Sequence, residues 1–399
     1  MNRESRSRTD SPIPLAPERP SPSFLESRFR LGGGFELVVF DRLEPPEQAA
    51  LAELRLDPHC YGLLRPRAGS AGTWKAVDRD LALLLLTLRE PGPLPFFALE
   101  GGAPGAEQDL EQLVLDGVLE VERGGGFVSG PAALPSGEPA PGTGRLARLS
   151  EQALRYGAAL GLSDPSELWP RLYGFHRLPL DRGWRARLAD ADAVLQFLAA
   201  SGSSRVAGLL EGGWELSRSR PGWLVWTPRR AAKLATAGGT FKLYLSPLPS
   251  ELPQVFAGLV ELLAERGGLP FKVGSDAAGL ARPDKLVVYL GSLEELEALA
   301  AELERRLPEV PPHGVPFTAE IGRGGLLSWG FDPPHGSSAF GEPESWRLWV
   351  VRRLAAALVA GGKQATPELP AWAFALERLR REGVDVERWT PRAELWRAA

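Results

Sequence analysis

The stretch Phe241-Lys-Leu-Tyr-Leu-Ser246 alternates apolar and polar side chains, which is the pattern of a β-strand with one buried face. Two further short apolar runs follow it, Pro270-Phe-Lys-Val273 and Pro283-Asp-Lys-Leu-Val-Val-Tyr289. A helix-like segment, 250–266, separates the first two runs, and a capping-box pattern at Ser292-Leu-Glu-Glu295 begins another helix after the third. Strands that alternate with helices in this way predict an α+β fold, with a mixed sheet and helical surroundings.

Each of these three strands carries one lysine (Lys242, Lys272 and Lys285), although the chain contains only six lysines against 40 arginines. A guanidinium stays protonated, so a group that must give up its proton has to be a lysine and not an arginine. If the strands are neighbours in one sheet, alternation brings the three lysines to one face with Tyr244 and Tyr289. Neighbouring ammonium groups lower one another's pKa, which favours one neutral amine that can act as a base. The alternative is a solvated sheet face on which the lysines only oppose aggregation.

Composition narrows the class of protein. The chain has 399 residues and a formal net charge of −4, which fits two or three domains and offers no basic field for nucleic acid or an anionic membrane. A single cysteine, Cys60, excludes an internal disulfide and is typical of a reducing cytoplasm. The histidines and Cys60 lack the spacing of a zinc site, and the longest aliphatic run, 81–88, is too short to span a bilayer. We therefore expect a cytoplasmic protein with no metal, no membrane partner and no nucleic-acid partner.

Composition also divides the chain into four segments. Residues 1–22 are rich in Ser, Arg and Pro and have no apolar stretch, so we expect a disordered tail there and no signal peptide. Residues 23–130 form a first domain, residues 131–145 a linker rich in Pro, Gly, Ser and Ala, and residues 146–399 a second domain. The strand and helix motifs described above occupy 240–330 of that second domain.

The first domain has the pattern of helices followed by a β-hairpin, which predicts a small winged-helix-like fold. Its expected helices are 45–56, 77–89 and 107–116, and its expected strands are 35–40, 118–121 and 126–128. A winged helix is typical of DNA-binding regulators, but the helix 107–116 contains four acidic residues and no Lys or Arg. Contact with DNA phosphates needs positive charge, so a DNA-binding regulator is disfavoured as the function of this protein.

The second domain begins with a mainly helical region, 146–235, in which Asp164 and Asp190 are expected helix N-caps. It contains a further candidate strand at 223–226 and a Gly-turn hairpin between 318 and 329. Two helices, about 344–360 and 368–382, are expected to close the chain.

The three lysine-bearing runs resemble the phosphoserine/phosphothreonine lyase domains of lanthipeptide synthetases of classes III to V. These domains are similar to the phosphothreonine lyase effectors of bacterial pathogens. The resemblance covers about residues 240–330 and implies a β-elimination of phosphate from phosphorylated Ser or Thr that needs no metal and no cofactor and yields dehydroamino acids. It also implies that Lys272 is the general base, that Lys242 polarises the amide carbonyl or contacts phosphate, and that Lys285 binds phosphate.

The general acid is the point at which this sequence departs from that family, whose members typically carry His two residues after the first Lys. Here that position is Tyr244, and a phenol with a reference pKa near 10 is a poor acid unless its neighbours lower that pKa. Either Tyr244 is the acid, or His313 supplies the proton from the next segment, or the site is not a lyase. Arg347, Arg352 and Arg353 are further candidate phosphate ligands, since Arg engages phosphate bidentately; the alternative is the basic face of an amphipathic helix.

The resemblance also implies partners. The substrate would be a phosphorylated precursor peptide, and a separate Ser/Thr kinase is expected because this chain carries no kinase signature. The outline of the first domain resembles leader-peptide recognition elements, which bind peptide by strand addition. The expected function is therefore phosphate elimination on a ribosomal precursor peptide, as in lanthipeptide maturation. The alternative is a non-catalytic partner protein with a degenerate lyase fold that binds the leader peptide or the kinase.

Overall fold

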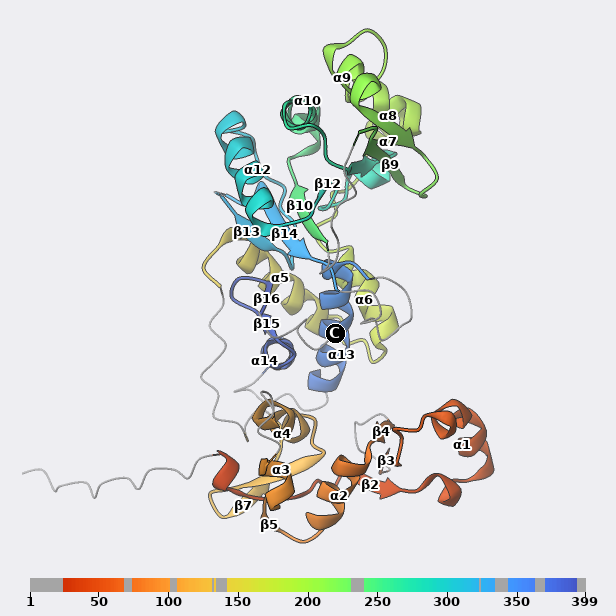
Figure 1. Cartoon of the computed structure of the whole chain (residues 1–399), viewed down its shortest axis with the longest axis vertical. Helices are drawn as coiled ribbons and strands as arrows, with labels where there is room; N and C mark the ends of the chain where they lie inside the picture. The colour runs from red at the N-terminus through yellow and green to blue at the C-terminus, as the bar shows by residue number, and fades with distance from the viewer. Residues whose placement is uncertain are drawn as a thin grey trace, which may run out of the picture. The chain divides into compact units, whose positions relative to one another are not determined.

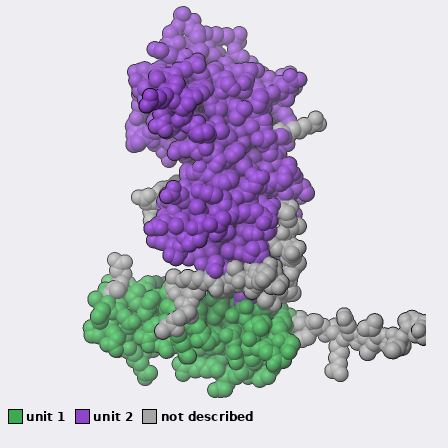
Figure 2. Space-filling view, turned by 180° about the vertical axis from the view of Figure 1, so that it is seen from behind, with its two compact units in different colours: residues 1–67, 74–129, 133–135 green, residues 68–73, 130–132, 136–399 purple. Residues whose placement is uncertain are grey.

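The computed structural model describes residues 24–67, 74–100, 106–130, 133, 142–230, 240–322, 324–333, 344–362 and 370–392. The chain divides into two compact units (Figure 2): unit 1 holds residues 1–67, 74–129 and 133–135, and unit 2 holds residues 68–73, 130–132 and 136–399. The expected tail, 1–22, and most of the expected linker, 131–145, lie outside the described residues. None of the described helices has the length and apolar character needed to cross a membrane.

Unit 1 contains two antiparallel sheets, one with the strand order β5-β1-β6-β7 and the other with the order β2-β3-β4. The expected hairpin is present as β6 and β7, whereas the helix expected at 45–56 is interrupted at Leu51 and continues as a 3₁₀ turn. The strands are β1 (Arg28–Leu31), β2 (Phe35–Val38), β3 (Gly62–Pro66), β4 (Lys75–Val77), β5 (Gly92–Pro93), β6 (Leu119–Arg123) and β7 (Gly126–Val128). The α-helices are α1 (Pro45–Ala50), α2 (Arg79–Thr87), α3 (Phe96–Glu100) and α4 (Ala106–Leu115). The winged-helix assignment of this unit stays a prediction.

A seven-stranded sheet is the centre of unit 2, with the strand order β13-β14-β10-β12-β11-β9-β8 (Figure 1). Its strands are β8 (Trp214–Ser217), β9 (Trp223–Pro228), β10 (Phe241–Leu245), β11 (Phe271–Gly274), β12 (Leu286–Leu290), β13 (Ala319–Ile321) and β14 (Leu327–Phe331). The three lysine-bearing runs are therefore neighbours, as the sequence hypothesis required. The expectation of a mixed sheet is wrong, because every pairing is antiparallel. The reason is that β12 lies between β10 and β11, so these two strands, which run in the same direction, never pair.

Helices cover one face of this sheet and form a second cluster beside it. Leu243, Phe271 and Val288 belong to one buried core with Phe256 and Leu259 of helix α10. Helices α5, α6, α13 and α14 pack against one another (Figure 1). The helices of unit 2 are α5 (Arg145–Ala159), α6 (Pro165–Tyr173), α7 (Arg182–Arg187), α8 (Ala191–Phe197), α9 (Arg205–Gly213), α10 (Leu252–Glu265), α11 (Ala277–Leu280), α12 (Leu293–Arg306), α13 (Trp346–Gly362) and α14 (Ala371–Arg381). A two-stranded ribbon, β15 (Val384–Asp385) and β16 (Thr390–Pro391), follows α14. Asp164 and Asp190 cap α6 and α8, as the sequence predicted.

Two glycines allow helix α11 to pack directly onto the end of strand β11. A Cβ atom at Gly274 would lie 2.5 Å from the carbonyl carbon of Gly279, so any larger residue would push the helix away. The chain leaves α11 through Arg282 and enters β12 at Leu286, four residues later. This close approach therefore fixes the residues from 282 to 285 beside the strand that carries Lys272.

Candidate active site

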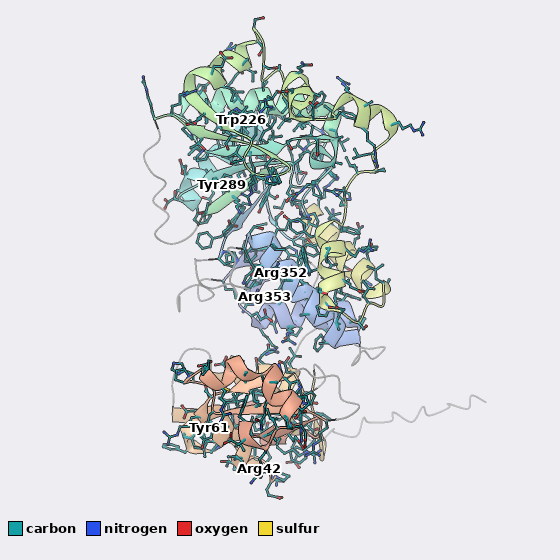
Figure 3. All side chains as sticks on the ribbon, turned by 90° about the vertical axis from the view of Figure 1, so that its right-hand side faces the viewer. Arg42, Tyr61, Trp226, Tyr289, Arg352 and Arg353 are labelled. Atoms are coloured by element: carbon teal, nitrogen blue, oxygen red, sulfur yellow. The ribbon has the colours of Figure 1, made fainter. Side chains whose placement is uncertain are left out.

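The strand register places two of the lysines on the face of the sheet opposite the apolar core. Lys242 on β10 lies directly across from Tyr289 on β12, and Lys272 on β11 lies across from Val287. Residues directly opposite in an antiparallel pair share a face, and Val287 and Tyr289 share one because they are two positions apart. Lys242 and Lys272 therefore flank Tyr289, which Figure 3 labels in the upper part of unit 2.

Lys272 is a buried amine with an unusually low pKa. Only 7% of its surface is exposed, and its Nζ lies 4.1 Å from the ring centroid of Trp223 and 5.6 Å from that of Tyr289. Burial, followed by the charges of Lys242 and Arg220, lowers the pKa of Lys272 to about 7. Within the described residues no carboxylate comes within ion-pair distance of Lys272 Nζ. A large fraction of this amine is therefore neutral near pH 7, which is what a general base requires.

Lys242 is a fixed positive charge next to that amine. Its ammonium group forms an ion pair with the carboxylate of Asp332, which directly follows strand β14. Lys242 Nζ also lies 5.5 Å from the ring centroid of Tyr289, so it approaches the same phenol as Lys272 does. Sequence reasoning did not find Asp332, because only the pairing of β10 with β14 brings it to Lys242.

Arg220 and Tyr289 are two further polar groups here, and neither was assigned a role from the sequence. Arg220 is exposed on the turn between β8 and β9, and its positive charge acts on the phenol of Tyr289. Burial raises the pKa of Tyr289 to about 12, although the positive charge of Arg220 opposes this rise. The turn reaches the site because Gly222 O accepts a hydrogen bond from Ser275 N at the end of β11. That contact depends on tertiary structure, so no local sequence signal identifies Arg220.

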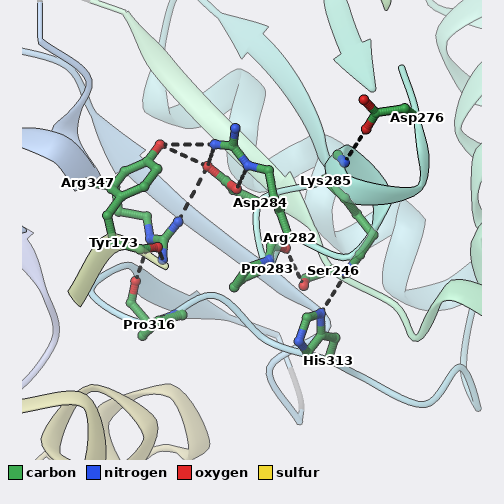
Figure 4. Close-up of polar contacts among 11 residues, drawn as sticks. Tyr173, Ser246, Asp276, Arg282, Pro283, Asp284, Lys285, His313, Pro316 and Arg347 are labelled. Atoms are coloured by element: carbon green, nitrogen blue, oxygen red, sulfur yellow. Dashed lines mark hydrogen bonds and ion pairs between the residues drawn. The ribbon is translucent and has the colours of Figure 1, made fainter. Parts of the chain in front are cut away.

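A buried carboxylate, Asp284, holds a polar network with Arg282, Arg347 and Tyr173 (Figure 4). Its oxygens accept hydrogen bonds from Arg282 at 2.9 Å and from the Tyr173 hydroxyl at 3.1 Å, and Arg347 Nη1 lies 3.4 Å away. Burial alone would raise the pKa of Asp284, but Arg347 and Arg282 outweigh it and hold that pKa well below its usual range. The Arg282 guanidinium carbon lies 4.8 Å from the ring centroid of Trp223, the ring that also contacts Lys272. Sequence reasoning did not find this network, although the adjacent charges in Arg282-Pro-Asp-Lys285 could have indicated it.

The three arginines expected to clamp phosphate do not form a clamp. Arg347 is 1% exposed, and besides contacting Asp284 it donates to the carbonyl oxygens of Pro316 at 3.2 Å and Tyr173 at 2.7 Å. Arg347 is therefore a buried structural partner of Asp284. Arg352 and Arg353 lie on α13, apart from Tyr289 in Figure 3, and pair with Glu344 at 2.6 Å and Glu382 at 3.0 Å. We therefore exclude all three from the phosphate site.

Lys285 and His313 also differ from their expected roles. Lys285 has 0% exposure and donates from Nζ to the carbonyl oxygen of Pro247, at 3.0 Å, and to His313 Nδ1, at 2.7 Å. Burial lowers the pKa of Lys285 to about 7. The expectation that Lys285 binds phosphate is therefore corrected, because its ammonium group points into the protein and has no exposed atom to offer.

The imidazole of His313 is held neutral. Its Nε2 lies 2.6 Å from the carbonyl oxygen of His176, and because a carbonyl oxygen can only accept, Nε2 carries the hydrogen and Nδ1 accepts from Lys285. Burial, followed by the charge of Lys285, lowers the pKa of His313 to about 3. His313 is 2% exposed, so it is neither charged near pH 7 nor accessible to a leaving phosphate.

Tyr244 is on the expected face of the sheet but is only 3% exposed and packs with Val287 and Val315. Burial, followed by the charge of Asp332, raises the pKa of Tyr244 well above its ordinary value. A phenol with a raised pKa is a weaker acid, and this one is also covered. The structure thus brings Lys242, Lys272 and Tyr289 together beside the exposed turn that carries Arg220, and it buries Tyr244 against Val287 and Val315. Within the described part of the chain, no group of three or more His, Cys, Asp or Glu side chains is arranged to hold a metal ion.

No family model matches this sequence, and no curated protein matches it. Solved structures similar to the chain include an effector protein from Pseudomonas syringae pv. syringae strain 61, with a TM-score of 0.39 and 16% identity, covering 62% of this chain and 97% of that one. They also include the type III effector/phosphothreonine lyase OspF from Shigella flexneri, with a TM-score of 0.27 and 14% identity, covering 42% and 90%. The Chromobacterium violaceum VirA (SpvC) phosphothreonine lyase effector has a TM-score of 0.27 and 16% identity, covering 45% and 86%. These TM-scores are below the level at which we infer a shared activity.

Proposed function

We propose that this chain removes phosphate from phosphorylated Ser or Thr residues of a peptide by β-elimination, with Lys272 as the general base. The observation that carries the proposal is Lys272 itself, a buried amine with a pKa lowered to about 7, without an ion-paired carboxylate among the described residues. Around it stand Lys242, Arg220 and Arg282, whose charges all contribute to lowering that pKa. An amine poised to take a proton, among cations that favour an anion, is what this elimination needs.

The bond changes in the proposed reaction balance without a further reactant. The neutral amine of Lys272 takes the α-proton, and the electrons of that C–H bond form the Cα=Cβ double bond. The Cβ–O bond breaks, and its electron pair leaves on the phosphate. Lys242 and Arg220 then offset the negative charge that develops on the carbonyl and on the departing oxygen. Tyr289 lies between the two lysines and replaces Tyr244 and His313 in our proposal as the group that hydrogen bonds the leaving oxygen.

The finer part of the proposal concerns the substrate and the partners. We propose a ribosomal precursor peptide as the substrate, phosphorylated by a separate Ser/Thr kinase, and unit 1 as the part that recognises the peptide. This rests on the sequence resemblance of residues 240–330 and on the outline of the first domain. A second candidate, a non-catalytic binding protein, is favoured by one observation: Lys242 and Arg282 are already paired with Asp332 and Asp284. Such pairing weakens their attraction for a phosphate.

Incubation with a phosphoserine or phosphothreonine peptide is expected to release inorganic phosphate and to leave a dehydroamino acid. Mass spectrometry distinguishes this elimination from hydrolysis, because a phosphatase leaves the hydroxyl group and an elimination removes it. A thiol added afterwards should form an adduct only with the eliminated product. The unphosphorylated peptide is the control. Binding of the phosphopeptide without phosphate release would contradict the enzyme and support the non-catalytic alternative.

The rate of elimination is expected to rise with pH through about 7 and then to level off, because the base works only in its neutral form. Lys242→Met removes a charge that lowers the pKa of Lys272 and frees Asp332, which acts in the same direction. The inflection of kcat/KM should therefore move upward by about one pH unit. Lys75→Met is the matched control, since Lys75 is also a lysine paired with a carboxylate, at 2.9 Å from Asp116, but lies in unit 1. An unmoved inflection in Lys242→Met would contradict Lys272 as the titrating base.

A further inference from the structure

An apolar groove of about 390 Å³ opens beside the network that holds Arg282. The chain from 178 to 188 forms one wall, residues 248–250 form the other, and helix α11 contributes Ala277 and Leu280. Leu180 and Trp184 line it while remaining partly exposed, whereas Leu280 is 1% exposed. The groove therefore offers half-covered apolar side chains above a buried apolar floor, which fits one aliphatic side chain of a partner.

The backbone links this groove directly to the proposed active site. Leu178 N donates to Ala281 O at 3.0 Å, and Ala281 immediately precedes Arg282, which stacks on Trp223 next to Lys272. Ala277 N donates in turn to Leu188 O at 2.8 Å, so both ends of the wall are fixed to α11. The groove and the proposed active site therefore share the short segment 281–282, in which Ala281 lines the groove and Arg282 lies over Trp223.

The same wall carries four exposed arginines, Arg177, Arg182, Arg185 and Arg187. None of them forms an ion pair with a carboxylate of the residues that the structure describes. Two nearby acidic residues cap helices instead of pairing with these arginines. Asp181 accepts a hydrogen bond from Trp184 N at 2.8 Å, and Asp190 accepts one from Ala193 N at 2.9 Å. This wall is therefore an arginine-rich rim along one side of an apolar groove, in a chain whose overall charge is negative.

We infer that this groove, lined by Leu180, Trp184 and Leu280 and edged by Arg182 and Arg185, is a docking site for an acidic segment of the phosphopeptide substrate. One aliphatic side chain of the peptide fills the groove, and Asp or Glu residues on either side pair with the arginines. This rests on the proposed function, because the peptide is taken to be the substrate of the Lys272 site. The positive charge of the rim favours an acidic peptide over the chain's own N-terminal segment. Residues 1–22 carry four arginines against three acids, so their net charge has the same sign as the rim.

The test is a fluorescence-anisotropy titration of the full chain with two labelled peptides, one of Glu and Leu residues and one in which every Glu is replaced by Lys. The acidic peptide should bind and the basic peptide should not, and binding should weaken as salt is raised. The double variant Arg182→Glu/Arg185→Glu should weaken binding by at least about tenfold, since it replaces two attractive charges with two repulsive ones. Leu180→Asp should weaken it as well. Arg266→Glu is the matched control, because Arg266 is exposed on the same unit and, among the described residues, its guanidinium donates only to the carbonyl oxygen of Ala298.

Turnover is measured separately, so the docking site and the lyase can fail independently. Lys272→Arg should bind the acidic peptide as the wild type does, even where it eliminates no phosphate. With a phosphopeptide that carries the acidic segment, the double variant should raise KM and leave kcat unchanged. Equal binding of both peptides, or an unaffected double variant, overturns the inference. Displacement of the probe by a peptide of residues 1–22, or a dimer that Leu180→Asp dissociates, also overturns it, because the groove would then belong to the chain itself.

Discussion

Replacement of Lys272 by Arg is expected to lower kcat/KM for phosphate elimination by about a thousandfold, the scale on which a positioned general base contributes. Arg keeps the positive charge and the contact with the Trp223 ring, which lies 4.1 Å from Lys272 Nζ. It removes only the capacity to become neutral, because a guanidinium stays protonated at any pH at which the protein folds. The measurement is the initial rate of phosphate release at several pH values, with near-ultraviolet circular dichroism to confirm native packing.

Arg220→Lys is the matched control for this substitution. Lys272→Arg replaces a lysine with an arginine, and Arg220→Lys replaces an arginine with a lysine at a position whose charge acts on Lys272 and Tyr289. We expect it to act mainly on KM, since a lysine keeps the charge but loses the bidentate geometry toward phosphate. Small primary amines in solution should partly restore turnover to Lys272→Ala, because they can take the α-proton in place of the missing side chain. Full turnover in Lys272→Arg would show that another group is the base.

The sequence predicted the sheet face of the lysines because that property follows from local geometry. Side chains alternate between the two faces of a strand, so every second residue shares a face. The runs around Lys242, Lys272 and Lys285 are short, and the alternation holds along each of them. Helix caps at Asp164 and Asp190 were predictable for the same reason, since a cap is decided by a residue and its next three neighbours. Strand β8 was missed because its residues, 214–217, directly follow helix α9 with no loop between them, and Gly212 and Gly213, which read as a turn in the sequence, end that helix.

The partners of the long charged side chains could not be predicted from local sequence. Alternation predicted Lys285 on the same sheet face as Lys272, but Lys285 precedes β12, and its Nζ contacts His313 and the carbonyl oxygen of Pro247, which come from separate loops. Arg347 was expected near phosphate because an arginine is a good phosphate ligand, and its actual partners, Asp284 and Tyr173, lie far from it in sequence. Whether such a charge faces a substrate or a buried carboxylate is decided by packing between remote segments.

That packing predicts a large loss of stability when Asp284 is replaced by Asn. Asp284 is 5% exposed and is the carboxylate that faces both Arg282 and Arg347, so Asp284→Asn leaves two guanidinium groups without their counter-charge. Removing one partner of a buried ion pair typically costs about 3–5 kcal/mol, because the remaining charge has lost its solvent as well as its partner. Denaturant unfolding followed by circular dichroism should show this loss in unit 2.

The control is Asp192→Asn, which removes an equally close partner of an arginine, Arg218 at 2.7 Å, from a surface where the side chain of Asp192 is 72% exposed. An exposed pair contributes at most about 1 kcal/mol, so equal effects of the two substitutions would show that burial does not strengthen the Asp284 network.

The pH dependence of stability gives an independent check. Because the folded-state pKa of Asp284 lies below that of the unfolded chain, near 3.9, its contribution is complete above that pH and is lost as the pH falls below it. Asp284→Asn should therefore be less stable than the wild type near neutral pH, and the difference should narrow in acid.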